Sequence, residues 1–81
     1  MEHALLAAVR ARGLRQWQLA VEARLRESRV SHIIRHGGAT AEERQRIAEA
    51  LGMDEGLLFG RDVNIAAILN AVAGDEPPAA V

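Results

Sequence analysis

Apolar and polar positions in this 81-residue chain recur with helical spacing, and no segment alternates with the period of a strand. The clearest pattern spans residues 16–35, where two short apolar runs are separated by only a few residues. The positions in these two runs are Leu19, Ala20, Ala23, Val30 and Ile33. Two helices joined this closely must cross at a steep angle, which is the layout of a helix-turn-helix.

The remaining apolar runs, with their caps and breakers, predict an all-α chain. We expect helices at about residues 3–12, 16–24, 27–35, 41–51, 55–59 and 63–73. Thr40 and Glu43 have the spacing of a capping box, in which each side chain accepts from the other residue's backbone N–H. Asp54 and Asp62 are expected to cap the fifth and sixth helices, and Gly74 to end the sixth.

Length and composition predict one small intracellular domain. The chain has no cysteine, so neither a disulfide nor a thiolate metal site can stabilise it. No basic segment precedes an apolar run at the N-terminus, and no apolar run approaches the ~20 residues that span a bilayer. We therefore expect a cytoplasmic protein that makes no contact with a membrane.

The net charge of −1 conceals an uneven distribution. Residues 1–35 carry seven Arg against three acidic residues (+4), and residues 36–81 carry three Arg against eight (−5). The positive half contains the predicted helix-turn-helix. Binding to phosphate would require this distribution, although clustering on ordinary amphipathic helices would also produce it.

The sequence does not predict an enzyme, a metal site or a cofactor. Cysteine and tyrosine are absent, no histidine is paired with a plausible nucleophile, and no glycine-rich loop is suited to phosphate. His32 and His36 have a spacing that can hold zinc from one helix face, but no third ligand is suitably spaced. We therefore expect His32 to have a role other than metal binding. His36 lies near the C-terminus of its helix, where the negative end of the helix dipole favours the charged imidazolium.

Three sequence blocks carry a resemblance to a known family. They are GLxQxxLA from Gly13, VSxI from Val30 and IAxALG from Ile47. In order and spacing they resemble the Cro/lambda-repressor-like (xenobiotic-response-element type) helix-turn-helix domain, over roughly residues 4–60 and with one residue deleted near Gly37-Gly38. The resemblance implies a five-helix DNA-binding domain, usually a bacterial or phage repressor that binds a palindromic operator as a dimer.

The chain departs from the family pattern in three places. Arg24 stands where the family commonly has glycine in the turn, and Arg26 stands where Ser or Thr usually caps the recognition helix. Val9 and Ile34 replace an Arg–Glu pair that family members often bury. Exchanging both partners of a buried ion pair for aliphatic residues is often neutral or stabilising, so the double change is expected if the two positions touch.

The resemblance places the DNA-reading face on the third helix, at Glu27, Ser28 and His32. Such side chains can accept from cytosine N4, pair with several bases and donate to guanine, respectively. The residues expected to contact phosphate, together with the N-terminus of the second helix, are Gln16, Arg26, Arg29 and Arg35. Trp17 could pack on the DNA backbone or on a protein partner, but we expect it to lie partly buried against a neighbouring helix.

The sixth helix is apolar almost all round, and a surface helix of a small monomer should keep a polar face. We expect it to form a C2 dimer interface rather than only to fold back over the core. Its predicted interface stripe is Ile65, Ile68, Leu69 and Val72.

The predicted organisation is therefore a DNA-binding domain at 1–60, an apolar interface helix at 61–74 and a disordered tail at 75–81. The expected function is a sequence-specific double-stranded DNA-binding transcriptional regulator, a small dimeric repressor. The alternative is an antitoxin or adaptor whose main partner is a protein, with DNA binding secondary or lost.

Overall fold

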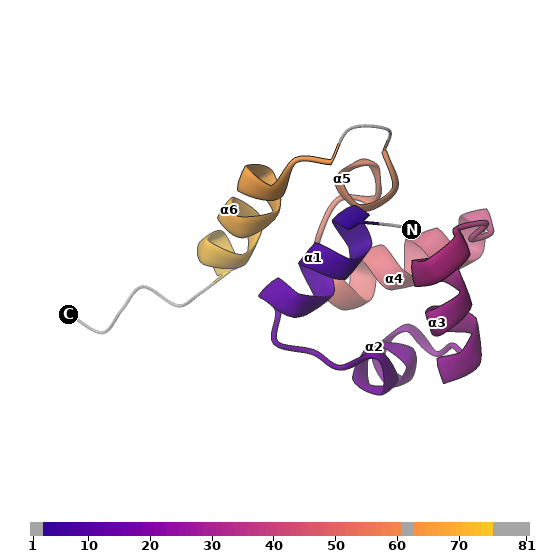
Figure 1. Ribbon diagram of the computed structural model, residues 1–81. Coiled ribbons are helices and arrows are strands. Elements are labelled where there is room, and N and C mark those ends of the chain that lie inside the picture. The colour runs from indigo at the N-terminus through magenta and orange to yellow at the C-terminus, as the bar shows by residue number, and fades with distance from the viewer. Residues whose placement is uncertain (1–2, 61–62, 76–81) are drawn as a thin grey trace.

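The computed structural model describes residues 3–60 and 63–75, and these form helices and no strand. The prediction of an all-α chain is confirmed. The helices in chain order (Figure 1) are α1 His3–Ala11, α2 Gln16–Ala23, α3 Glu27–His36, α4 Ala41–Leu51, α5 Glu55–Phe59 and α6 Ile65–Asp75.

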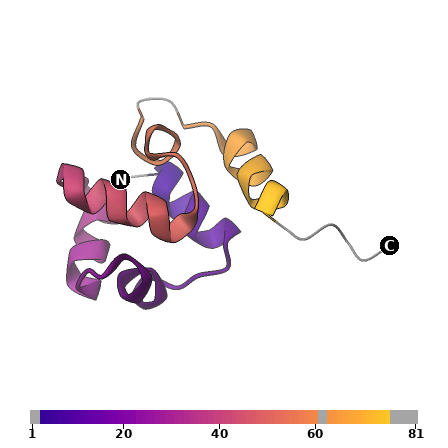
Figure 2. The same cartoon turned by 180° about the vertical axis from the view of Figure 1, so that it is seen from behind.

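The helices pack in two groups that share one core. α2 packs against α3 and α4, while α1 packs against α6, α5 and α3. In both Figure 1 and the reverse view of Figure 2, α3 and α6 lie at opposite ends of the molecule, with α1 beside α6. The surfaces of α3 and of α6 are therefore separate.

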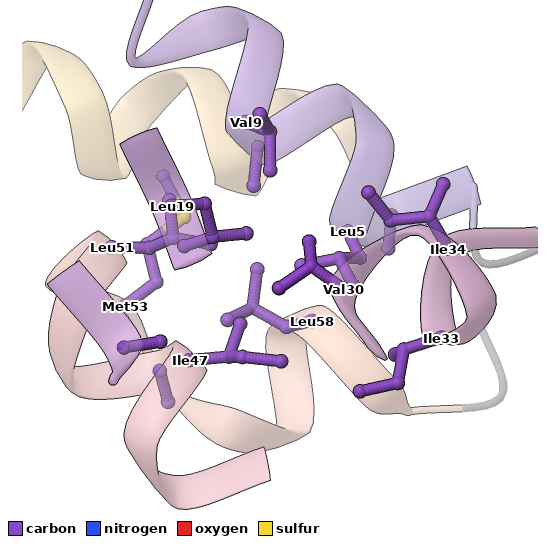
Figure 3. Packing of buried hydrophobic residues seen from close by; sticks show 14 of the residues in the cluster. Leu5, Val9, Leu19, Val30, Ile33, Ile34, Ile47, Leu51, Met53 and Leu58 are labelled. Atoms are coloured by element: carbon purple, nitrogen blue, oxygen red, sulfur yellow. The ribbon is translucent and has the colours of Figure 1, made fainter. Parts of the chain in front are cut away.

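Within the described ranges every buried side chain is apolar. Figure 3 shows the central cluster, in which α1, α2, α3, α4 and α5 all contribute side chains. Val9 of α1 and Ile34 of α3 are both buried in this cluster, and their helices are in contact. The two positions where the family often buries an Arg–Glu pair are thus part of the apolar core here. The other residues that are fully buried and large are Leu5, Leu19, Val30, Ile33, Ile47, Leu51, Leu58 and Ile68.

Three of the helices end with the same pair of backbone hydrogen bonds. Gly13 ends α1, Arg24 ends α2 and Gly52 ends α4, and each of the three has a positive φ. At Arg24 (φ 59°, ψ 43°) the Leu25 N–H donates to the Ala20 carbonyl at 2.9 Å. This motif favours glycine, because a side chain in the left-handed region crowds the backbone. The turn of the helix-turn-helix is therefore strained at Arg24.

We expect Arg24→Gly to raise the free energy of unfolding by about 1 kcal/mol, because glycine occupies the left-handed region without a steric penalty. Urea unfolding followed by circular dichroism measures this difference. Arg24→Ala is the matched control, since it removes the same charge and keeps the crowded Cβ. Equal unfolding free energies for the two variants would contradict the interpretation.

The predicted helix caps are correct at two positions and wrong at the third. The Thr40 Oγ1 accepts from the Glu43 N–H at 3.1 Å, and an Asp54 carboxylate oxygen accepts from the Gly56 N–H at 3.0 Å. For α6 the cap is Asn64, whose Oδ1 accepts from the Ala67 N–H at 3.0 Å. The helix begins two residues later than predicted for this reason, and the predicted cap Asp62 lies outside the described residues.

The C-terminal end of α6 also differs from the prediction. The helix continues through Gly74 to Asp75, so Gly74 does not end it and residue 75 is not part of an irregular tail. One glycine costs only about 1 kcal/mol in a helix and does not by itself stop it. The rest of the predicted tail, residues 76–81, lies outside the described residues.

Candidate nucleic-acid interface

α3 has one face in the core and an opposite face in solvent. Val30 and Ile33 are buried, and Glu27, Ser28 and His32 are exposed. Positions three or four apart share a helix face, so Val30 and Ile33 lie on one face and Ser28 and His32 on the other. Glu27 is three positions before Val30 and is exposed as the first residue of α3. The three residues predicted to contact bases are thus all accessible, Ser28 and His32 on the outer face of α3 and Glu27 at its N-terminal end. Their contact with DNA stays a prediction.

Cationic side chains flank this surface. Arg26 precedes α3 and Arg35 lies in its last turn; both are exposed, and neither forms an ion pair within the described part of the chain. Arg24, in the turn before Arg26, is also exposed. Gln16 begins α2, whose first backbone N–H groups carry the positive end of the helix dipole. These groups are suited to phosphate oxygens.

Arg29 differs from the other predicted phosphate ligands because it is bound within the protein. Its Nε donates to Glu43 Oε2 at 2.6 Å, and its Nη2 donates to Glu43 Oε1 at 2.9 Å. The same Nη2 donates to the Gly38 carbonyl at 3.1 Å. The guanidinium is therefore engaged by α4 and by the linker between α3 and α4 (residues 37–40). A phosphate contact by Arg29 would have to compete with these bonds.

The carboxylate of Glu43 is held in its charged form. The hydrogen bonds from Arg29 and then the backbone N–H of Thr40 lower the pKa of Glu43 from an ordinary 4.5 to about 2. Because the folded-state pKa lies below the unfolded value, the folded state binds fewer protons between these two values. The stabilisation is thus complete above pH 4.5 and is lost as the pH falls towards 2.

We therefore expect the stability advantage of the native chain over Glu43→Gln to shrink steadily as the pH is lowered from about 5 to 2, as linkage requires. Thermal unfolding of both proteins at a series of pH values measures it. A difference that stays constant across this range would show that Glu43 titrates normally in the folded state.

Trp17 is 52% exposed, and Val21, one turn further along α2, is 69% exposed. We expected Trp17 to lie partly buried against a neighbouring helix, and about half of its side chain is exposed. Trp17 lies in the first turn of α2, and the buried face of that helix is formed by Leu19, Ala20 and Ala23 instead. The exposed pair is thus a small apolar surface beside the predicted phosphate-binding end of α2.

The predicted interface stripe on α6 is divided between two faces of the helix. Ile68 is fully buried against the rest of the chain, and Val72 is partly buried against the same core. Ile65 and Leu69, by contrast, are 45% and 55% exposed. Ile68 and Val72 therefore belong to the monomer core, because α6 packs against α1 through that face. Ile65 and Leu69 are the exposed members of the predicted stripe, and a second copy would contact these two.

The two histidines of α3 lie close together at the accessible surface. The ring centroids of His32 and His36 are 5.1 Å apart. Among the described residues no group of three His, Cys, Asp or Glu side chains is placed to hold a metal ion. In the same part of the chain, no helix is both long and apolar enough to cross a membrane.

Comparisons with known proteins do not assign the chain to a family. No protein-family model, no curated protein and no solved structure matches it. The functional argument therefore depends on the geometry of α2, α3 and α6.

Proposed function

We propose that the chain is a sequence-specific double-stranded DNA-binding regulator of the Cro/lambda-repressor-like kind. The observation that carries the proposal is the arrangement of α3: its inner face is fixed in the core, its outer face presents Ser28 and His32, and Glu27 is exposed at its N-terminal end, beside exposed arginines. A short helix that is held rigidly and flanked by cations is suited to the major groove.

In the proposed complex, α3 lies in the major groove with Ser28 and His32 at base edges. Glu27 selects cytosine, whose N4 amino group can donate to its carboxylate. Without such a bond the carboxylate is only repelled by the phosphates. Arg26, Arg35 and the N-terminus of α2 contact phosphates and set the position of α3 along the groove. The chemistry is binding alone, and no catalytic step is part of the proposal.

We further propose that two copies associate through the outer face of α6. Ile65, Leu69 and the nearby Val63 are exposed apolar side chains, and Asn70, next to Leu69 in the sequence, is an exposed polar residue. Burying such a face removes apolar surface from water, which favours association. A two-fold dimer would read two half-sites separated by about 34 Å or a multiple of that distance.

Selection from a random duplex library tests the proposal. The expected result is enrichment of a palindrome whose half-sites are one or more helical turns apart, about 10 base pairs a turn. Enrichment of a single unrepeated half-site would contradict the dimer and leave the DNA-reading function intact. No enrichment would contradict sequence-specific binding.

The exposed Trp17 and Val21 favour a second candidate, in which the chain is an antitoxin or adaptor bound to another protein. Aromatic residues are enriched in the centres of protein interfaces. The two candidates differ in the dependence of DNA binding on salt. Several phosphate contacts give a steep negative slope of log K against log salt, and a protein-binding module that has lost DNA binding gives none.

A further inference from the structure

We infer that Arg29 is a positioning residue for the DNA-reading helix: paired with Glu43, it fixes the angle of α3 on the domain and does not bind phosphate. This inference rests on the proposed function. It assigns Arg29 a role opposite to the one that its charge and position in α3 suggest.

The pair lies across the segment that joins α3 to α4, residues 37–40. α3 is followed by Gly37 and Gly38, which have φ values of 76° and 80° and provide no side chains to restrain the linker. At its other end, α3 has no side-chain hydrogen bond at the N-cap, Arg26. Neither terminus of α3 is therefore fixed by its own capping side chain. The direct bond of Arg29 to the Gly38 carbonyl, together with its bond to Glu43, closes the linker back onto α3.

Glu43 is a rigid anchor for this contact. Its Oε1 accepts from both Arg29 Nη2 and the Thr40 N–H, each at 2.9 Å, and its side chain is only 13% exposed. α4 is in turn fixed by Ile47 and Leu51 in the core. The two parallel bonds between a guanidinium and a carboxylate fix orientation as well as distance. The chain of contacts thus runs from the core through α4 and Glu43 to α3.

Arg29 lies between the residues proposed to read bases. Ser28 precedes it directly, and His32 is three positions further along α3. Loss of the pair would therefore act on the placement of these two side chains. Base readout depends on hydrogen-bond geometry, whereas phosphate attraction tolerates small displacements. We therefore expect loss of the Arg29–Glu43 pair to weaken specific binding to DNA and to leave non-specific binding unchanged.

Two conservative variants separate positioning from phosphate binding because the two roles predict different results. Glu43→Gln keeps an acceptor for the Thr40 N–H but weakens the hold on Arg29. If Arg29 bound phosphate, this change would free the guanidinium and strengthen binding to specific and scrambled DNA alike, so the ratio of the two affinities would stay unchanged. If Arg29 positions α3, the ratio of specific to non-specific affinity falls, by about tenfold if the loss equals one imperfect base contact.

Arg29→Lys keeps the positive charge but loses the paired bonds. We expect it to lower the same ratio by about tenfold while the salt slope stays unchanged. Arg35→Gln is the control for a true phosphate ligand and should reduce the salt slope by about one. Arg29→Gln, which removes the charge, should leave the salt slope unchanged. A salt slope that falls in Arg29→Gln as it does in Arg35→Gln would overturn the inference, as would an unchanged ratio of specific to non-specific affinity in Glu43→Gln.

Hydrogen exchange of the free protein makes the test independent of any DNA. In Glu43→Gln and Arg29→Lys, the backbone amides of α3 should exchange at least several-fold faster than in the native chain, while those of α1 keep their rates. Unchanged exchange in α3 would refute positioning. If exchange in α3 is faster in the variants but the native chain prefers no DNA sequence, the positioning role of Arg29 holds and the proposed function is refuted.

Discussion

Replacing Ser28 and His32 together with alanine will remove the preference of the protein for its selected duplex over a scrambled one. If each side chain contributes about 1.4 kcal/mol of discrimination, within the range for good base contacts, the specificity ratio falls by about 100-fold. Both side chains are exposed, so the thermal unfolding midpoint should remain close to that of the native chain. Competition binding with the two duplexes measures the ratio.

The matched control is the double alanine variant of Gln45 and Glu49, which are exposed and spaced by one turn on α4 as Ser28 and His32 are on α3. This variant should retain the native specificity ratio. If the control loses specificity as strongly as the α3 variant, or if the α3 variant keeps it, the base-reading surface is not the outer face of α3.

Substitution by aspartate at two adjacent residues of α6 should have different effects, on folding at one and on dimer formation at the other. Ile68→Asp places an unpaired carboxylate in the core and should cost several kcal/mol, so that α6 detaches or the chain unfolds. Leu69→Asp alters a side chain that is 55% exposed, so the monomer should stay folded while the dimer is lost. Light scattering gives the mass, and circular dichroism gives the helix content and the melting temperature.

Gln45→Asp, a comparable change at an exposed site on α4, should leave both mass and melting unchanged. A folded Leu69→Asp protein with the mass of a dimer would contradict the α6 interface. A stable Ile68→Asp protein would contradict the packing of α6 on α1.

The helices could be predicted because their signals are local. The apolar spacing of Leu19, Ala20 and Ala23 predicted the buried face of α2, and Val30 and Ile33 did the same for α3. Capping is also local, since the Thr40–Glu43 box depends on residues three positions apart. The all-α class follows from these patterns alone.

The remaining features depend on tertiary contacts that no local pattern encodes. Arg29 and Glu43 are fourteen positions apart, and only the packing of α3 near α4 brings them together. The apolar stripe of α6 likewise did not reveal which side of the helix packs against α1. Ile68 is buried in that packing, whereas Leu69 is exposed. Both Asp62 and Asn64 are residues that cap helices, so the sequence could not decide between them.

Fluorescence anisotropy of labelled DNA tests the central claim most directly. The native chain is titrated into the duplex from upstream of its own gene, and into a scrambled duplex of equal length, at two salt concentrations. The account predicts tight binding that prefers the native duplex and weakens steeply with salt, since Arg26 and Arg35 of each copy would neutralise phosphates and the α2 N-terminus would contact a further one. Absent binding, or equally weak binding to both duplexes, would contradict a DNA-reading function and favour a protein partner for this fold.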